Sequence, residues 1–274
     1  PIGTLGFRVQ RYGMLQWGDL FTARQKVVQL ILTKETHRRS NPTINDALGL
    51  VVSRLLDYGS AQTTWVPLGE FIRGTFGRQA LPVVWDFSEP VPWTDSSGNF
   101  EGALDWVVRV VETWPQKSMP GQVQIADATE SPLPDQASAI WFTDPPYYDA
   151  IPYSDLSDFF LTWMKRILPN HPLLSDPFDA SNRLSPKLRE AVQDETKMVG
   201  GRPKDRKFFE ETMAKAFIEG RHILNEAGIG SVVFAHKTTE GWEALLSGMI
   251  RGGWTITASW PVATERPGRL RSHD

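Results

Sequence analysis

The stretch "SAIWFTDPPYYDAIPYSD", residues 138–155, carries the main clue to the fold of this chain. It sets an apolar run directly against an aspartate, two prolines and two tyrosines. Proline fixes its own φ angle and holds the residue before it extended, so Pro145 and Pro146 cannot continue a central strand. The stretch therefore predicts a buried strand that ends at a stiff turn.

Short apolar runs and helical patterns alternate from residue 122 onward. Strands are expected at "QVQIAD" (122–127), "SAIWFTD" (138–144), "GSVVFAHK" (230–237) and "WTITASWPV" (254–262), and helices at 154–168, 205–226 and 239–253. The helix at 154–168 would begin at Ser154 as N-cap and bury one apolar stripe: Leu156, Phe159, Phe160, Trp163 and Ile167. Such alternation predicts a doubly wound, parallel α/β sheet.

The first 120 residues have a different pattern, mostly helical. Thr22 can cap a helix whose inner face would carry Val27, Leu30 and Ile31. A second helix is expected at 41–59 and a third at 101–114, with irregular structure or short strands between them at 60–100. We therefore expect an N-terminal region, 1–120, packed on an α/β catalytic half, 121–274, with an excursion at 169–204 that holds one short helix.

Composition and charge narrow the functional classes. The net charge of -3 and a pI near 6.0 give no general attraction to polyanions, so any contact with nucleic acid needs a local basic patch. The absence of cysteine excludes disulfides, thiolate catalysis and cysteine-ligated metal, and we expect no metal site. No signal peptide and no membrane-spanning apolar stretch is found in the sequence, so a cytoplasmic location is expected.

The turn after residue 143 has a specific chemistry. The stiff prolines hold the carboxylate of Asp144 and a nearby backbone carbonyl in a fixed relation, and both groups are hydrogen-bond acceptors. Two acceptors suit a substrate that presents two hydrogens on one nitrogen, and Tyr147 offers a flat face for a planar ring. Because the benefit grows as positive charge builds on that nitrogen, the arrangement would stabilise the transition state in which an amino group attacks an electrophile.

The motif "DPPY" after an apolar strand resembles the catalytic motif of S-adenosylmethionine-dependent amino methyltransferases. Together with "FAHKTTEGWEALL", "GWTITASWPVATERPGRLR" and "GFRVQRYGMLQWGDLFTARQ", it is similar to the large prokaryotic adenine-specific DNA methylases that often carry a zinc ribbon and an N-terminal domain of unknown function. The resemblance implies a Rossmann-like class I methyltransferase sheet and the cofactor S-adenosyl-L-methionine. It further implies methylation of the N6 amine of adenine in DNA, in a restriction-modification or phage-defence setting.

The resemblance assigns roles to single residues. Asp144 and Pro145 would accept the hydrogens of the target amine, Pro146 would set the turn, and Tyr147 would stack on the extruded base. Asp127 matches an acid that helps to hold the adenosine of the cofactor, although an ordinary turn aspartate explains it as well.

Further candidates lie outside the motif. Phe21 and Thr22, in "GDLFT", match a segment near the methionine end of the cofactor, while a helix cap explains Thr22 equally well. His236 follows an expected strand and could reach the pocket, but a structural histidine is the commoner case. Four basic residues near the excursion could contact phosphates or simply form a solvated face: Arg202, Lys204, Arg206 and Lys207.

One expected feature is missing from the sequence. Methyltransferases of this kind carry a strand that ends in a glycine-rich cofactor loop, Asp-Pro-Phe-x-Gly-x-Gly, and no such loop is found here. We therefore expect a catalytic-half fragment with an incomplete sheet, whose free edge a second chain or copy would complete. Methylation of RNA or of another amine, and a non-catalytic remnant that binds nucleic acid or a partner, remain the alternatives.

Overall fold

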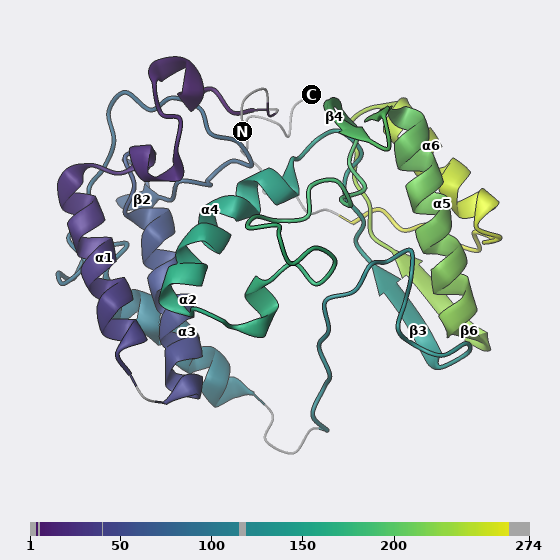
Figure 1. Ribbon diagram of the computed structural model, residues 1–274, viewed down its shortest axis with the longest axis horizontal. Helices are drawn as coiled ribbons and strands as arrows, with labels where there is room; N and C mark the ends of the chain where they lie inside the picture. Colours follow the sequence, from purple (N-terminus) through teal and green to yellow (C-terminus); the bar gives the residue numbers. More distant parts are fainter. Residues whose placement is uncertain (1–3, 5, 40, 115–118, 263–274) are drawn as a thin grey trace.

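The computed structural model describes the chain except for residues 1–3, 5, 40, 115–118 and 263–274. Over the described residues the fold is mixed α/β, with six α-helices and three two-stranded sheets, of which one is parallel. Figure 1 shows the helices α1 to α4 on one side and the parallel sheet with α5 and α6 on the other. None of the described helices is long and apolar enough to cross a membrane.

The helices expected in the first 120 residues are confirmed. They are α1 (Ala23–His37), α2 (Pro42–Tyr58) and α3 (Phe100–Thr113), preceded by the short 3-10 helices η1 (Val9–Tyr12) and η2 (Trp17–Leu20). Side chains of Thr22, Asn41 and Asn99 cap the three α-helices by accepting a backbone N–H in the first turn. Residues 60–100 form only the hairpin of β1 (Thr64–Val66) and β2 (Phe71–Arg73), as the glycine- and proline-rich sequence predicts.

The inner face expected for α1 is wrong. Its apolar residues Val27, Leu30 and Ile31 are exposed, while the polar residues on the opposite side are buried: Gln25, Gln29, Thr33 and Thr36. In α2 the apolar residues Val52, Leu55 and Leu56 are fully buried. The apolar side chains of α2 and α4 fill the core. The helix α1 therefore packs against these two helices with its polar side.

The helix α4 (Tyr153–Ile167) has the expected apolar stripe. Phe159, Trp163 and Ile167 are buried in a core that also contains residues of the first 81 positions: Phe7, Val9, Leu20, Phe21, Val52, Leu56 and Leu81. α4 contacts both α1 and α2, so it belongs to the helical core although it follows the motif in sequence. Ser154 is not the N-cap. Pro152 takes that position, and the Ser154 hydroxyl donates to Glu190 from inside the helix.

The second core surrounds the parallel sheet. β3 (Ser138–Thr143) pairs in parallel with β6 (Leu224–Val232), and the helices α5 (Arg206–Ile223) and α6 (Thr239–Arg251) pack together beside it. β6 begins and ends earlier than the strand expected at 230–237, because α5 passes directly into it. Phe209, Met213 and Phe217 from α5 form the core with Ala244 and Leu245 from α6.

Two expected strands are wrong. Residues 122–127 and 254–262 have strand-like sequences but belong to no sheet. Most of their apolar side chains are exposed, including Val123 at 85% and Trp260 at 79%. A strand needs a neighbour for its backbone hydrogen bonds, and neither segment has one in the described part of the chain. The expected doubly wound sheet is therefore reduced to the pair β3–β6.

The excursion at 169–204 contains the expected short helix, the 3-10 turn η3 (Pro172–Leu174). It also contains a hairpin that the sequence interpretation missed, formed by β4 (Asp194–Val199) and β5 (Arg202–Lys204). Gly200 and Gly201 make its tight turn with φ angles of 57° and 79°. Positive φ at both central residues is the geometry of a two-residue hairpin turn, so the dipeptide Gly-Gly between extended residues was the signal.

Candidate functional site

The turn 144–147 lies directly at the carboxyl end of β3. The Val233 N–H donates to the Thr143 carbonyl at 2.9 Å, and this is the last backbone hydrogen bond at the carboxyl ends of β3 and β6. Beyond it, Asp144 is exposed, Pro145 is buried, and Pro146 and Tyr147 are partly buried. The buried proline fixes the turn to the sheet, and the exposed carboxylate is held at its edge.

Backbone bonds define which carbonyls of the turn remain accessible as acceptors. Tyr148 N–H donates to Pro146 at 2.9 Å, and Ala150 N–H donates to Tyr147 at 2.9 Å. Among the described residues, no N–H or side chain donates to the carbonyl oxygen of Pro145. The exposed carboxylate of Asp144 and the carbonyl of Pro145 are thus both left as acceptors in the turn.

Tyr148 anchors the turn from behind. It is buried and has a φ angle of 52°, which is uncommon for a bulky side chain. Its hydroxyl donates to Glu240 at 3.0 Å, and its carbonyl accepts from the Gln193 N–H at 3.0 Å. Burial, and then the hydrogen bond to Glu240, raise the pKa of Tyr148. α6 and the excursion therefore hold the strained residue next to the motif in place.

Tyr147, the last residue of the motif, lies against a second aromatic ring. Its ring centroid is 5.6 Å from that of Phe234, with the planes at 79°. Burial raises the pKa of Tyr147, and the hydrogen bond to Asp144 and the charge of Asp144 raise it further. The Tyr147 hydroxyl is thus engaged with the carboxylate, while half-burial leaves part of its ring surface open.

Phe234 is a site residue that the sequence interpretation missed. It follows β6 directly and lies edge-on to Trp242 at 5.1 Å and parallel to His236 at 6.2 Å. Since the carboxyl ends of adjacent parallel strands coincide, the residues after β6 must lie beside those after β3. The available sequence signal was the aromatic residue placed just after the apolar strand residues in "VVFAH".

His236 connects the segment after β6 with the segment after β3. Its Nδ1 accepts from the Thr238 N–H at 3.2 Å, so in the neutral ring Nε2 carries the proton and donates to Asp149 at 3.1 Å. The side chain is only 6% exposed. This arrangement matches the structural histidine considered from sequence, with both ring nitrogens occupied.

Asp127 has its carboxylate oxygens engaged. One oxygen accepts from the N–H and the hydroxyl of Thr129 at 2.9 and 2.6 Å, and the other pairs with Arg189 at 2.9 Å. Burial acts to raise the pKa of Asp127, but the hydrogen bonds from Thr129 and Arg189 outweigh it and lower that pKa. This is the geometry of a turn aspartate in an ion pair.

Phe21 and Thr22 also have structural partners. Phe21 is buried and stacks on Phe159 at 5.8 Å, and Thr22 caps α1 in a reciprocal capping box with Gln25. Neither the hydroxyl of Thr22 nor the carboxylate of Asp127 is left unpaired to receive a cofactor group. The three residues expected to hold S-adenosylmethionine are thus all engaged in structural contacts.

Three of the four basic candidates are paired with glutamates. Arg202 and Lys207 both contact Glu211, at 3.3 and 3.8 Å, and Arg206 contacts Glu210 at 2.7 Å. Arg206 also lies 3.7 Å from both Glu240 and Glu243. The structure thus surrounds these cations with acidic groups and does not form a strongly positive patch.

Lys204 differs from the other three because it is completely buried. Its Nζ donates to the carbonyl of Lys187 at 2.9 Å and lies 5.2 Å from the ring of Phe208. Burial lowers the pKa of Lys204 to about 8, against opposing effects of Glu190 and other acids. With no exposed surface, this side chain offers nothing to a phosphate.

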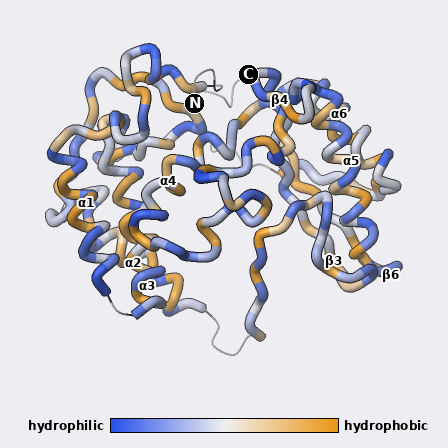
Figure 2. The backbone as a smooth tube through the Cα atoms, in the orientation of Figure 1, coloured by the Kyte–Doolittle hydropathy of each residue, from blue (hydrophilic) through white to orange (hydrophobic). Residues whose placement is uncertain are grey.

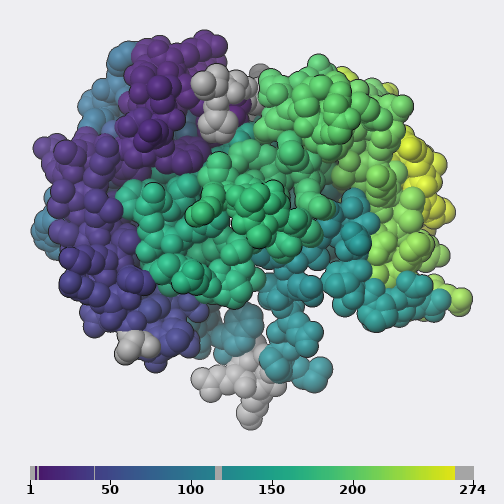
Figure 3. Space-filling model, viewed as in Figure 1, coloured from purple at the N-terminus to yellow at the C-terminus, as the bar shows by residue number. Residues whose placement is uncertain are grey.

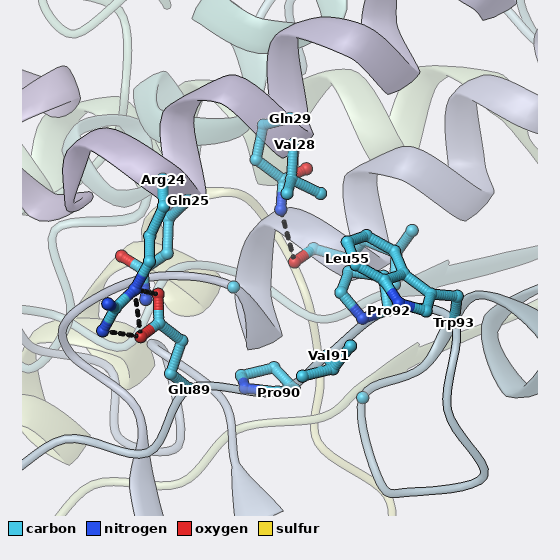
Figure 4. A pocket seen from close by; sticks show the side chains of 12 residues that line it. Arg24, Gln25, Val28, Gln29, Leu55, Glu89, Pro90, Val91, Pro92 and Trp93 are labelled. Atoms are coloured by element: carbon cyan, nitrogen blue, oxygen red, sulfur yellow. Dashed lines mark hydrogen bonds and ion pairs between the residues drawn. The ribbon is translucent and has the colours of Figure 1, made fainter.

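A separate cavity of about 370 Å³ lies between α1, α2 and the loop 89–98. Figure 4 shows Arg24 paired with Glu89 at one end and Trp93 at the other, with Val28, Leu55 and three residues of the loop between them. The hydrogen bond from Arg24, assisted by its charge, lowers the pKa of Glu89. No residue of 144–147 lines this cavity, so its largely apolar wall is unrelated to the motif.

Comparison with models of known protein families, with curated proteins and with solved structures found no match for this chain.

Proposed function

We propose that this chain is the amine-holding part of an S-adenosylmethionine-dependent methyltransferase that modifies the exocyclic N6 amine of adenine in DNA. The observation that carries the proposal is the turn after β3, in which Asp144 is exposed, the Pro145 carbonyl has no described donor, and Tyr147 lies beside both. The class I, Rossmann-like sheet of such an enzyme is part of the proposal, supported by the parallel pair β3–β6.

The two acceptors would each bind one hydrogen of the target amine. The nitrogen lone pair of an aromatic amine is delocalised into its ring, and holding both hydrogens favours its localisation toward the incoming methyl group. If a sulfonium methyl group were transferred, its C–S bond would break as the N–C bond forms and leave a thioether. The nitrogen would become positive, and its hydrogen bonds to Asp144 and Pro145 would strengthen. Asp144, which would accept one hydrogen of this amine, is the group we propose to take the proton that the nitrogen must lose.

Tyr147 and Phe234 would receive the ring of the extruded base. Extrusion from a duplex costs a few kcal/mol, and stacking on an aromatic side chain offsets about 1–3 kcal/mol of it. Tyr147 is half-buried and its edge packs against Phe234, so its position is fixed before the base arrives. The cofactor would supply an electrophilic methyl group. The residues expected to hold it, Phe21, Thr22 and Asp127, have structural partners, and the sequence has no Asp-Pro-Phe-x-Gly-x-Gly loop, so we propose that a second chain supplies the donor side.

The proposal is tested by transfer of a radiolabelled methyl group to duplex DNA and to RNA. Asp144→Asn keeps the shape but weakens the charge-assisted bond, and should lower the rate by about 10- to 100-fold, from a loss of about 1.5–3 kcal/mol. Asp135→Asn, a change at an exposed carboxylate before the opposite end of β3, is the control and should have no effect. Transfer to RNA alone overturns the DNA assignment.

A second measurement separates the enzyme from a non-catalytic remnant. Adenine replaced by 2-aminopurine in a DNA duplex becomes fluorescent when it leaves the stack, and this reports binding of the target base without methyl transfer. An increase that is lost in Tyr147→Ala supports the acceptor site, and unchanged fluorescence with no transfer to any nucleic acid rejects it. DNA binding that persists in Tyr147→Ala and Asp144→Asn, without extrusion or transfer, favours the remnant.

A further inference from the structure

The cavity drawn in Figure 4 is held open by a loop that is attached at both ends. At one end, the Nε of Arg24 on α1 donates to both carboxylate oxygens of Glu89, at 2.8 and 2.7 Å. At the other end, the N–H of Phe100, the first residue of α3, donates to the carbonyl of Pro92 at 2.6 Å. Pro90 and Pro92 fix their own φ angles, so the segment between the two attachments is stiff. The space of about 370 Å³ is therefore preformed.

The wall of this cavity is mostly apolar and has no net charge. Both helices and the loop contribute apolar side chains, which are Val28, Leu55, Pro90, Val91, Pro92 and Trp93. Among the described residues that line the cavity, two are charged, Arg24 and Glu89, and they neutralise each other. Trp93 is 75% exposed, so much of its ring can receive a flat molecule. A volume between about 300 and 1,000 Å³ with a few polar groups in an apolar wall is typical of small-molecule sites.

Two glutamine side chains in the wall have polar atoms without partners. Gln25 and Gln29 line the cavity and are only 5% and 2% exposed. The Oε1 of Gln25 accepts from the Thr22 N–H, and the Nε2 of Gln29 donates to the Leu55 carbonyl. The other atom of each amide, Nε2 of Gln25 and Oε1 of Gln29, has no hydrogen-bond partner among the described residues. Because buried polar groups are nearly always paired, an orphaned donor and an orphaned acceptor beside one cavity indicate a bound molecule that completes them.

The orphaned donor and acceptor lie one helical turn apart on α1. Residues i and i+4 share one face of a helix, so the amides of Gln25 and Gln29 are neighbours. Figure 2 shows hydrophilic and hydrophobic residues alternating along α1, and Figure 3 shows residues of the 60–100 region emerging behind it. The last torsion of a glutamine side chain is broad, so each amide can turn its free atom toward a guest.

We propose that this cavity binds an uncharged, planar heterocycle that carries a carbonyl next to an N–H on one edge, as a lactam does. The Nε2 of Gln25 donates to the carbonyl of the ligand, and the N–H of the ligand donates to the Oε1 of Gln29. The ring lies against Trp93, within the apolar part of the wall. Donor and acceptor of the ligand thus match the acceptor and donor that the protein leaves unpaired.

Other occupants fit the cavity less well. Water needs two to four polar partners, and most of this wall offers none. A nucleotide or another charged ligand would need a free cation, but Arg24 is already paired with Glu89. The proposed site is also independent of the proposed methyl transfer, because no residue of 144–147 lines the cavity, so either proposal can fail without the other.

Calorimetric titration of the whole chain with 2-quinolone, a bicyclic lactam, tests the site directly. The matched probe is N-methyl-2-quinolone, which keeps the ring and the carbonyl but lacks the N–H. The lactam should bind with one-to-one stoichiometry and about tenfold more tightly than the methylated probe, because only the lactam can bond to the Oε1 of Gln29. No binding of the lactam at millimolar concentration, or equal affinity for the two probes, overturns the proposal.

Substitutions in α1 locate the bound probe. Val28→Phe fills the cavity and should abolish binding, whereas Val27→Phe, at a neighbouring residue that is 54% exposed and outside the wall, should leave it unchanged. Gln29→Leu should remove the preference for the lactam over its methylated form, and circular dichroism shows whether each variant folds. Binding that survives in a folded Val28→Phe places the probe elsewhere and rejects the site. The comparison of the two probes on the unaltered chain holds even where a variant does not fold.

Discussion

Tyr147 contributes two separable groups to the proposed site, a ring and a hydroxyl. The ring lies edge-on to Phe234, and the hydroxyl lies close enough to Asp144 for that carboxylate to raise the pKa of Tyr147 further after burial. Tyr147→Phe keeps the ring, so binding of an extruded base should change less than about threefold, whereas Tyr147→Ala should weaken it by about 10- to 100-fold through lost stacking. Fluorescence titration of a 2-aminopurine duplex measures both. Equal losses in the two variants would show that the hydroxyl, and not the ring, binds the base.

Lys204 links the stability of the protein to pH. Burial lowers its pKa from 10.5 to about 8, so between these values the unfolded chain holds a proton that the folded chain has released. The free energy of unfolding should therefore rise with pH from about 8 to about 10, by roughly 2–3 kcal/mol. Urea unfolding at several pH values measures this rise.

The matched variants for this prediction are Lys204→Met and Lys207→Met. The first removes the buried amine and should abolish the rise, while the second removes an exposed amine and should preserve it. Replacement of a buried charge by an apolar side chain of similar size should also leave the protein at pH 7 as stable or more stable. The same slope in Lys204→Met would assign the pH dependence to another group.

At the scale of elements, the hairpin β4–β5 depends on its turn. Gly201 has a φ angle of 79°, and a Cβ added there would meet no atom within 4 Å. Gly201→Ala should therefore destabilise the protein only through backbone strain, by about 1–2 kcal/mol in urea unfolding. Gly18→Ala is the control, because a Cβ there also meets nothing and its φ is not in the left-handed region. Equal effects of both changes would exclude strain as the cause.

The helices show which local signals were sufficient. Thr22 and Asp205 each accept a backbone N–H and start α1 and α5 where the sequence predicts. The stripe of α4 is buried as its spacing predicts, because Phe159 and Trp163 have no alternative core. The face of α1 could not be predicted, since its orientation is determined by the residues of α2 and α4 that it meets. A periodic pattern thus predicts that a helix forms more reliably than it predicts which element that helix packs against.

At the scale of the whole molecule, Asp155 joins parts of the chain that are far apart in sequence. This buried carboxylate on α4 pairs with Lys197 of β4 at 2.7 Å and accepts from Thr4 at 3.3 Å, and Lys187 lies 4.0 Å away. Asp158, one turn later, also pairs with Lys187. The helical core, the excursion and the N-terminal segment are thus connected through a buried ionic cluster behind the motif.

Asp155→Asn should destabilise the protein by about 3–5 kcal/mol, because it leaves Lys197 and Lys187 with less compensating charge in a buried site. Asp105→Asn, which breaks an exposed pair with Arg109 on α3, should cost less than about 0.5 kcal/mol. Calorimetric or urea unfolding of both variants provides the comparison. A small effect of Asp155→Asn would mean that water reaches the cluster and screens it.

The residues of the two hydrophobic cores are relevant to how the chain divides into domains. The boundary expected at residue 120 stays a prediction, but α4 and its residues Phe159 and Trp163 complete the core of the preceding region. The excursion, expected to hold only one short helix, bonds to Tyr148 through Gln193 and to Ser154 through Glu190. The elements that position the motif therefore come from both sides of that boundary.

The sequence by itself determined the features that depend on neighbours along the chain. These are the capped helices, the apolar stripe of α4, and the turn in which two prolines place Asp144 after β3. Tertiary structure alone determined which strands pair, that Lys204 is buried, and that Phe234 lies beside Tyr147. Helical hydrogen bonds close within four residues, whereas strand pairing and burial need partners from distant segments, and residues 122–127 and 254–262 have the pattern of strands but no such partner.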